Sequence, residues 1–378
     1  ASLVGSEMCI RDRMEGFALE LEDELMNFSD VSYKSFVKSE SEIITLFYDK
    51  FADIPLLSRM DAVAETFIDE IETLLNRDLP EEERIPLIEK FRKMYETMDF
   101  YVLYNRFLKK EGYQTLPRRP LEKRKLRYED VYPILYLKYR LSRQAERSNI
   151  KHLVIDEMQD YSLLQYLIIR RMFSCKMTIL GDRAQTMADQ QQDVLQFLPG
   201  IFGKDLRRIE MRKSYRNTVE IASYAANLIG VTDLELFERH GMPVLERDVT
   251  DLEAALREAV DTLLPDEKTY ETAAVIVPDE KTAERAYLIL RGILAEKDFD
   301  CGKRLSWLNR DSSSFKKGLT VTTFYLAKGL EFDQVFSIFP KDEKREIMMQ
   351  AQYIAATRAL HEPVSYTHLR AHETSAHL

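Results

Sequence analysis

The sequence contains few residues that break helices or cross-link chains. Its 378 residues include 12 glycines, 12 prolines and 3 cysteines. Three widely spaced cysteines exclude a disulfide framework and a four-cysteine zinc site, and they favour a reducing, cytoplasmic setting. The low glycine and proline content favours long helices. No run of 18 apolar residues occurs, which argues against a membrane span, and we expect no membrane partner.

The composition is that of a globular protein with an acidic balance. Hydrophobic residues make up 45% and charged residues 31% of the chain, which excludes disorder caused by low hydrophobicity. The 54 basic and 64 acidic side chains give a formal charge of −10. This balance argues weakly against a protein that coats nucleic acid, but it leaves room for a local basic groove.

Both ends of the chain differ from the rest. Residues 1–13 and 364–378 resemble translated sequencing-adapter read-through, and three of the six histidines (His368, His372 and His377) fall in the last eleven residues. Neither end has the basic and apolar regions of a secretory signal. We expect both ends to be non-native tails that lie outside the fold and hold no metal site. The alternative is a frayed natural terminus.

Residues 14–127 have the pattern of a helical region. No glycine occurs between Phe17 and Glu111, and apolar residues recur at helical spacing, as in Ile68 and Ile71. This predicts several long helices with little sheet. The stretch Arg118–Arg127 holds six basic residues and one acid. A solvated helix face is the favoured interpretation of this stretch, and a phosphate contact is the alternative.

After Asn149, short apolar runs alternate with helical patterns. Strands are predicted over 152–155, 177–180, 273–277, 319–323 and 335–339, and helices over 162–173, 218–229 and 282–294. The alternation predicts an α/β fold, with buried parallel sheets split between two lobes. Residues 230–246 are expected to be irregular.

Two adjacent carboxylates end the first of these strands. Asp156 and Glu157 follow His152–Ile155, and the carboxyl ends of parallel strands are where open α/β sheets bind ligands. One carboxylate can hold Mg²⁺ while the other orients or deprotonates an attacking water. The alternative is that the two acids cap the N-terminus of a helix.

Five segments of the chain carry the strongest signal. They are Asp156–Asp160 (DEMQD), Gly181–Gln185 (GDRAQ), Ser214–Thr218 (SYRNT), Thr322–Asp333 (TTFYLAKGLEFD) and Ile354–Ala359 (IAATRA). In this order and spacing they resemble the successive motifs of UvrD/Rep-like superfamily 1 DNA helicases. The resemblance implies two RecA-like P-loop NTPase lobes, a cytoplasmic enzyme that uses ATP and Mg²⁺, and DNA as partner, as a single strand or duplex junction.

The resemblance also implies roles for individual residues. Asp156 binds Mg²⁺, and Glu157 is the catalytic base for water attack on the γ-phosphate. Gln185 senses that phosphate, and Gly181 and Asp182 shape the turn before it. Arg216 and Arg358 are arginine fingers, whose planar forks suit the charge of the transferred phosphoryl group. The alternative for each arginine is a surface salt bridge.

Further residues are implied to bind nucleotide or nucleic acid. Glu331 and Gly329, with Lys328, lie near the nucleotide and couple it to the strand-binding track. Tyr215 also belongs to the nucleotide site, and Thr323 and Lys328 to the nucleic-acid site.

The phosphate loop of the family is missing from the sequence. No Gly-x-x-x-x-Gly-Lys-Ser/Thr occurs, and Gly200–Asp205 has the wrong spacing and no hydroxyl for Mg²⁺. Because this loop holds the β- and γ-phosphates, we expect the chain to be an internal fragment that does not hydrolyse ATP by itself. The expected parts are a helical region (14–127), an incomplete first lobe (128–204) and a second lobe (205–363).

Other departures point to a subgroup. Thr186–Met187–Ala188 stands where the family has an apolar residue and a base-stacking aromatic, and Tyr325 replaces a usual histidine. Only 104 residues separate Arg216 from Thr320, too few for the family's large inserted subdomain. The last two departures resemble HelD-type proteins, as do the segments Tyr128–Leu137, Asp156–Ser162, Met177–Asp182 and Tyr325–Asp333. HelD-type proteins are related to helicase IV and recycle stalled RNA polymerase. The helical region is then an arm that contacts a partner, or a subdomain packed on its own lobe.

Three functions therefore remain open. The first is a 3′-to-5′ DNA helicase or translocase, and the second is a HelD-like ATPase with RNA polymerase as partner. The third is a degenerate nucleotide-binding lobe that serves as an interaction module; the retained acids and arginines argue against it.

Overall fold

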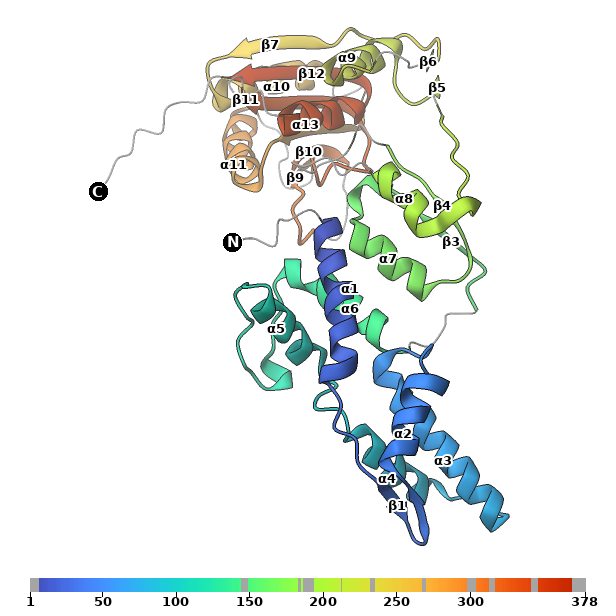
Figure 1. Cartoon of the computed structure of the whole chain (residues 1–378). Coiled ribbons are helices and arrows are strands. Elements are labelled where there is room, and N and C mark those ends of the chain that lie inside the picture. The colour runs from blue at the N-terminus through green and yellow to red at the C-terminus, as the bar shows by residue number, and fades with distance from the viewer. Residues whose placement is uncertain are drawn as a thin grey trace, which may run out of the picture. The chain divides into compact units, whose positions relative to one another are not determined.

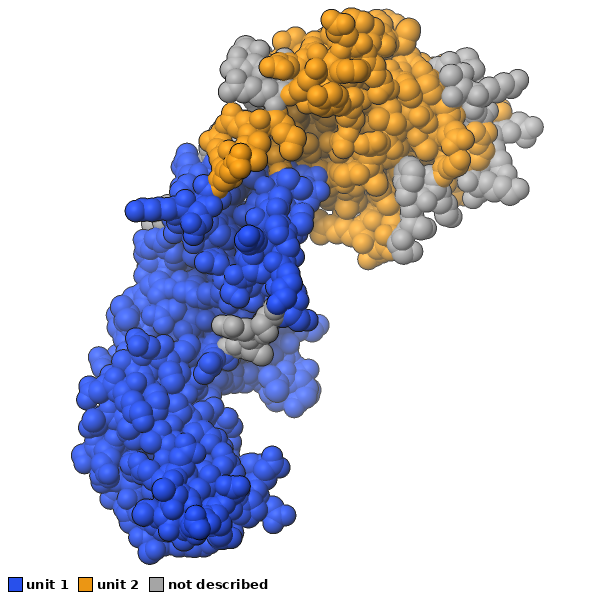
Figure 2. All heavy atoms as spheres, turned by 90° about the vertical axis from the view of Figure 1, so that its right-hand side faces the viewer, with its two compact units in different colours: residues 1–180, 194–206 blue, residues 181–193, 207–378 orange. Residues whose placement is uncertain are grey.

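The computed structural model describes residues 7–143, 149–182, 185, 194–211, 213–231, 235–266, 270–297, 304–312, 317–340 and 346–368. The chain divides into two compact units (Figure 2). Unit 1 comprises residues 1–180 and 194–206, and unit 2 comprises residues 181–193 and 207–378. Each unit has hydrophobic clusters of its own.

Most of unit 1 is helical, as the sequence predicts. Its first helices are α1 (Glu7–Glu24), α2 (Glu40–Thr45), α3 (Arg59–Leu75), α4 (Glu81–Arg92), α5 (Phe100–Lys110) and α6 (Tyr128–Leu141). They share one core, in which Ile68 and Ile71 are fully buried. Leu164 and Ile168 lie on α7 (Leu163–Met172), and they belong to the same core. The helical region therefore shares a core with the α/β part of unit 1.

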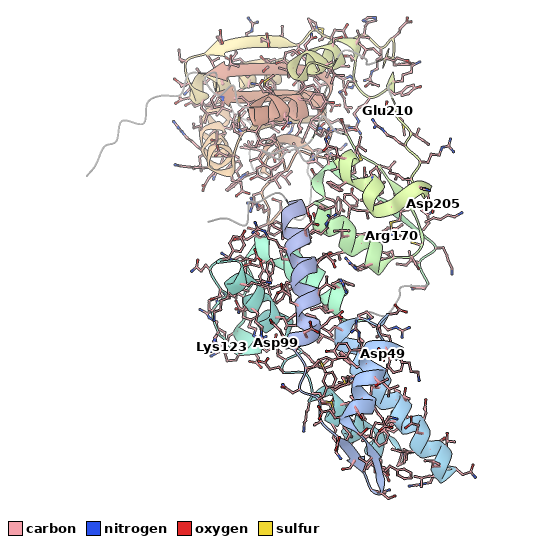
Figure 3. The ribbon with its side chains drawn as sticks, in the orientation of Figure 1. Asp49, Asp99, Lys123, Arg170, Asp205 and Glu210 are labelled. Atoms are coloured by element: carbon pink, nitrogen blue, oxygen red, sulfur yellow. The ribbon has the colours of Figure 1, made fainter. Side chains whose placement is uncertain are left out.

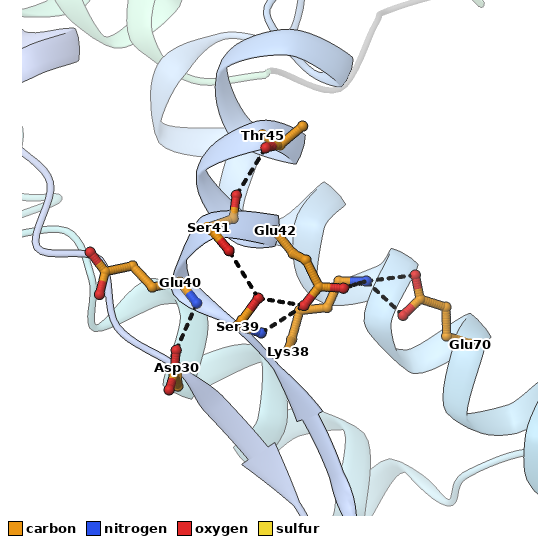
Figure 4. Close-up of polar contacts among 8 residues, drawn as sticks. All are labelled: Asp30, Lys38, Ser39, Glu40, Ser41, Glu42, Thr45 and Glu70. Carbon is orange, nitrogen blue, oxygen red and sulfur yellow. Dashed lines mark hydrogen bonds and ion pairs between the residues drawn. The ribbon is translucent and has the colours of Figure 1, made fainter.

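A small hairpin that the sequence did not predict lies between α1 and α2. Its strands β1 (Val31–Tyr33) and β2 (Phe36–Lys38) are antiparallel. The buried Lys38 ammonium lies 2.7 Å from both carboxylate oxygens of Glu70 on α3 (Figure 4). Ser39 and Glu42 form a capping box at the start of α2. These polar contacts attach the hairpin to α2 and α3.

The α/β part of unit 1 is small. Strands β3 (His152–Ile155) and β4 (Lys176–Ile179) are parallel and joined by α7 (Leu163–Met172), close to the predicted bounds, and α8 (Val194–Phe202) follows. The prediction that both sheet faces are covered is wrong for these strands. Leu153 and Ile155 face α7 and α8, whereas Val154 is 60% exposed, because in the described residues helices pack against only one face of this two-stranded sheet.

Unit 2 contains a six-stranded parallel sheet in the order β7-β12-β11-β8-β10-β9 (Figure 1). The strands are β7 (Leu245–Val249), β8 (Thr272–Val277), β9 (Leu305–Trp307), β10 (Gly318–Thr323), β11 (Phe332–Pro340) and β12 (Ala359–His368). Helices α10 (Leu252–Asp266) and α11 (Glu280–Glu296) share a core with one face, and α9 (Val219–Ile229) and α13 (Glu346–Thr357) with the other. The predicted strands and helices of this unit are confirmed to within a few residues, and the fold class is α/β.

The predicted irregular segment 230–246 contains a short strand. This strand, β6 (Glu235–Leu236), is parallel to β5 (Lys213–Ser214), and β7 begins at Leu245.

Two expectations about the chain need correction. The expectation that residues 364–378 lie outside the fold is wrong for 364–368, because Val364 and Tyr366 are buried as the second half of β12. Residues 7–13 likewise form the start of α1. The Arg118–Arg127 stretch is exposed but not helical, since Pro117 and Pro120 allow only one short turn there. None of the helices in the described part of the chain combines the length and apolar character of a membrane span.

Candidate functional site

The acidic pair lies at the carboxyl end of β3 in unit 1. Asp156 is exposed, and one of its carboxylate oxygens accepts the backbone N–H of Glu157 at 2.8 Å. Glu157 has a left-handed backbone with φ of 52°, and its carboxylate accepts a hydrogen bond of 2.6 Å from the Gln159 amide. Such a backbone costs a non-glycine residue roughly 1–3 kcal/mol and is enriched at functional sites. Gln159 therefore orients the side chain of Glu157.

The alternative interpretation of these acids, a helix cap, does not describe the structure. The N-terminus of α7 is capped by Ser162, whose hydroxyl accepts the N–H of Gln165. Gln165 in turn accepts the N–H of Ser162 through its side chain at 2.6 Å. The carboxylates of Asp156 and Glu157 therefore do not cap α7.

In unit 2, residues from the GDRAQ and IAATRA segments meet around a buried guanidinium group. Arg358 is 2% exposed and donates to the side-chain oxygen of Gln185 at 3.3 Å. The Gln185 amide and the Tyr353 hydroxyl both donate to the same carboxylate oxygen of Asp182, at 2.9 and 3.2 Å. Burial, and then the charge of Asp182, raises the pKa of Tyr353 well above its ordinary value. Tyr353 is therefore a neutral hydroxyl donor to this carboxylate.

The second candidate arginine lies on the surface of unit 2. Arg216 forms an ion pair with Glu331, with 2.8 Å between Nε and Oε1, and the two side chains are 50% and 41% exposed. An ion pair this exposed contributes at most about 1 kcal/mol, so a phosphate group can compete for Arg216. The alternative of a surface salt bridge describes Arg216 as it stands, but not the buried Arg358.

Hydrogen bonds to main-chain carbonyl oxygens join the segments that carry these two arginines. The buried Asn217 amide donates to the carbonyl oxygens of Thr357 and Ala359, at 3.3 and 3.1 Å. The N–H of Phe332 donates to the carbonyl of Arg358 at 3.0 Å. The Arg239 guanidinium donates to the carbonyls of Arg216 and Leu360, at 3.1 and 3.2 Å. Four of the five motif segments therefore contribute to one hydrogen-bonded group around Arg358.

An exposed aromatic pair lies next to Arg216. Tyr215 is 64% and Phe237 45% exposed, and their ring centroids are 5.6 Å apart. The Lys213 ammonium lies 5.6 and 5.7 Å from the two ring centroids. An exposed ring beside cations is a suitable surface for a nucleotide base.

The remaining candidates lie in and after β10. Thr323 is fully buried, and in the described part of the structure its hydroxyl has no hydrogen-bond partner. Its carbonyl accepts the N–H of Ala327 in the turn that follows. Lys328 is half-buried, and Gly329 is exposed with φ of 78°, a backbone that favours glycine. Gly181 is exposed beside Asp182.

The candidates thus fall into two sets. Asp156 and Glu157 belong to unit 1, and all other predicted site residues belong to unit 2. Thr186–Met187–Ala188 lies outside the described residues. Among the residues that the structure describes, no cluster of three His, Cys, Asp or Glu side chains could hold a metal ion. Asp156 nevertheless offers an exposed carboxylate, the kind of oxygen ligand that Mg²⁺ takes alongside phosphates and water.

Sequence reasoning missed four of the residues that organise this site: Asn217, Phe237, Arg239 and Tyr353. Asn217 and Tyr353 stand beside or inside quoted motifs, and their neighbours were a signal that could have included them. Phe237 and Arg239 had no such signal, because they contact residues more than 20 positions away.

The chain resembles known proteins over part of its length. Residues 14–187 match the family model described as the UvrD/REP helicase N-terminal domain. This match covers 174 of the 378 residues, less than half of the chain. No curated protein matches the chain.

Several solved structures show a more limited similarity. The C-terminal domain of a possible DNA helicase from Lactobacillus plantarum WCFS1 is 23% identical with a TM-score of 0.33, covering 41% of this chain and 88% of that one. The PRRSV helicase (14%, TM-score 0.32) and Mycobacterium smegmatis Lhr bound to ssDNA and AMP-PNP (11%, TM-score 0.38) each cover 71% of this chain. The chain spans only 45% and 37% of these two proteins. We base no functional assignment on these similarities.

Proposed function

We propose that the chain is part of an ATP-dependent nucleic-acid motor of the 3′-to-5′ DNA helicase or translocase type. The observation that supports this most is the hydrogen-bonded group around Arg358, because it joins residues of four separate motif segments. A set of unrelated surface residues would have no reason to converge in this way. The coupled steps are ATP hydrolysis and movement along a strand.

The proposed chemistry is transfer of the γ-phosphoryl group of ATP to water. Asp156 would hold Mg²⁺, which neutralises phosphate charge when bound. Glu157 would accept the proton of the attacking water as the new P–O bond forms. The bond from the γ-phosphorus to the β–γ bridging oxygen breaks, and ADP carries away that electron pair. Arg216 and Arg358 would stabilise the charge of the phosphoryl group, and Gln185 would link Arg358 to the phosphate.

Nucleotide and strand would be bound by other residues of the same motifs. Tyr215 would stack on the base, Glu331 and Gly329 would lie beside the nucleotide, and Lys328 would contact the strand. Because Thr323 is fully buried, it would support the turn after β10 through its carbonyl rather than contact the strand. When the phosphates of ATP bind the guanidinium of Arg216, the ion pair between Arg216 and Glu331 would break. This exchange would connect the nucleotide state to the strand-binding segment after β10.

We further propose that the chain does not turn over ATP by itself. The sequence has no phosphate-loop motif, and main-chain N–H groups of such a loop are what hold the β- and γ-phosphates.

The test is ATP turnover by the chain after fusion to the strand, phosphate loop and helix of a UvrD/Rep helicase. We expect single-stranded DNA to stimulate turnover, and Glu157→Gln to lower the stimulated rate by roughly 10²–10⁴-fold, as loss of a general base does. The unfused chain should show no turnover above its Glu157→Gln variant. A fused protein that ignores DNA, or that tolerates Glu157→Gln, would refute the proposal.

The second candidate is a HelD-like ATPase that releases RNA polymerase from stalled complexes. It is favoured by Tyr325, which stands in the turn after β10 with Arg310 above its ring at 5.9 Å, and by the short distance between Arg216 and Thr320 in the sequence. Core RNA polymerase should then co-purify with the chain, and polymerase rather than DNA should stimulate turnover. Strong stimulation by DNA without polymerase binding would favour the helicase.

A further inference from the structure

The segment between α5 and α6 is a loop that is fixed at both ends. Leu116 is buried, and the Asn105 side chain bonds both its N–H and its carbonyl, at 2.6 and 3.3 Å. At the other end, Arg127 makes two hydrogen bonds to Asp130, which is fully buried and also accepts from the Tyr104 hydroxyl at 2.9 Å. A loop held in this way loses little conformational freedom when it binds a ligand.

A third attachment lies in the middle of the loop. Arg124 pairs with Asp99 at 2.7 Å and lies over the Tyr101 ring at 4.7 Å. Its backbone is extended and follows the short 3-10 turn Leu121–Lys123. Lys123 and Lys125 are both exposed, and Figure 3 labels Lys123 near Asp99. The paired arginine thus lies between two lysines that are exposed to solvent.

Four cations of this loop have no carboxylate partner in the described part of the chain. We call them the basic loop: Arg118, Arg119, Lys123 and Lys125. All four are exposed, and none forms an ion pair with the residues that the structure describes. Glu122 is the only acid between residues 113 and 127, so four cations and one acid leave +3 exposed on a chain of net charge −10. Elsewhere in unit 1, exposed cations such as Lys34 and Lys110 are paired, with Glu83 and Glu20 respectively.

An exposed aromatic ring follows the basic loop directly. Tyr128 is 77% exposed, and its ring is held edge-on against Tyr132 with 5.9 Å between the centroids. It lies three residues after Lys125, a backbone distance of at most about 10 Å. Cations that contact phosphates, next to a ring that stacks on a base, are the combination that single-stranded nucleic acid requires.

We propose that the basic loop and Tyr128 form a contact site for single-stranded nucleic acid on unit 1. This inference rests on the proposed function as a nucleic-acid motor and adds a binding surface outside its five motifs. Duplex is disfavoured because stacked base pairs offer no free face to Tyr128. An anionic membrane is disfavoured because the loop, although Leu121 and Leu126 are exposed, is not the amphipathic helix that binds an interface.

The experiment measures binding of a fluorescent oligothymidylate to the unfused chain by anisotropy, at several salt concentrations between 50 and 200 mM. The test variant is R118Q/R119Q/K123Q/K125Q. Each phosphate contact adds about 0.7 to the slope of log K against log salt for a single strand, so removing four contacts should reduce the slope by about 3. The matched control, K50Q/R77Q/K93Q/R143Q, removes four exposed cations of unit 1 that form no ion pair with a carboxylate in the described ranges, and it should leave the slope unchanged.

The tyrosine is tested separately. Tyr128→Ala should weaken binding roughly 5- to 150-fold, which corresponds to the loss of one stacked base. Tyr128→Phe keeps the ring and should bind like the unmodified chain. All altered side chains are exposed, so circular dichroism and melting should show unchanged folding for every variant.

Several outcomes would overturn this inference. Equal losses in the basic-loop and control variants would show only the effect of net charge. Equal binding of duplex and single strand, with no effect of Tyr128→Ala, would exclude a single-strand site. Loss of binding to phosphatidylserine vesicles, but not to DNA, would identify a membrane contact. In these cases the ATPase test of the fused chain still decides the proposed function by itself.

Discussion

Among single residues, Asn217 does the most to hold the candidate site together. Its amide donates to carbonyl oxygens on both sides of Arg358, and its neighbour Arg216 is paired with Glu331. A buried amide that satisfies two carbonyls is costly to remove, because it would leave both acceptors without partners. The position of Arg358 therefore depends on a residue that need not touch the nucleotide.

A pH-dependent contact lies beside this group, at the start of α9. Glu220 accepts hydrogen bonds from His240 and from the N–H of Gly241, and these lower its pKa from the ordinary 4.5 to about 2. Because the pKa is lowered in the folded state, the ionised carboxylate stabilises the fold above pH 4.5. This contribution is lost as the pH falls from 4.5 towards 2.

We therefore expect Glu220→Gln to lower the melting temperature at pH 6, with the difference from the unmodified chain shrinking as the pH falls below 4.5. Thermal melts followed by circular dichroism at several pH values measure this. Glu284→Gln, at an exposed position of α11, makes the same change in charge and should show no such trend. A difference for Glu220→Gln that is constant with pH would contradict the pKa shift.

The sequence was enough to predict which residues are candidates for the site, but it was not enough to predict which contacts they make. The acids after β3 could be predicted, because the local sequence pattern shows both the apolar run of the strand and the DEMQD segment that ends it. The hydrogen bond from Arg358 to Gln185 spans 173 positions, and only the tertiary fold could reveal it. The ordering of Glu157 by Gln159 depends on a left-handed backbone that composition and periodicity do not indicate.

Among elements, the strands of unit 2 followed most directly from the sequence. β8 and β10 are short runs of apolar and β-branched residues that are buried on both faces, and such runs are distinctive. β12 was misjudged because its second half was assigned to a foreign tail, although Val364 and Tyr366 alternate towards the core. In unit 1 the β1–β2 hairpin was missed, since two three-residue strands give little periodicity.

The start of β10 depends on a glycine. Gly318 has φ of 109°, and a Cβ there would overlap the carbonyl oxygen of Arg304. We expect Gly318→Ala to destabilise unit 2 by roughly 1–3 kcal/mol, the usual cost of such a backbone for other residues. Chemical denaturation measures the change.

Gly292 is the matched control, because it lies inside α11 and a Cβ there would meet nothing within 4 Å. Gly292→Ala should stabilise the chain by roughly 0.5–1 kcal/mol, since glycine is unfavourable in a helix. If both substitutions had the same effect, backbone strain at Gly318 would not be a property of this fold.

For the whole molecule, the division into two units determines how function must be tested. The acids belong to unit 1 and the arginines to unit 2, and each unit has its own core. Neither set alone has the groups that phosphoryl transfer requires, which are a base, a metal ligand and cations for the developing charge. The proposed function therefore requires that both sets serve one reaction.

A double-mutant cycle in the fused, phosphate-loop-containing chain tests this claim most directly. The stimulated ATP turnover is measured for Glu157→Gln, Arg358→Ala and the double variant. Groups that serve the same transition state are strongly non-additive. We predict that each single change lowers turnover at least about 10²-fold, and that the double variant is no more than about tenfold slower than the slower single variant. A loss of turnover in the double variant equal to the product of the two single losses would contradict the account. An Arg358→Ala variant with unchanged turnover would also contradict it.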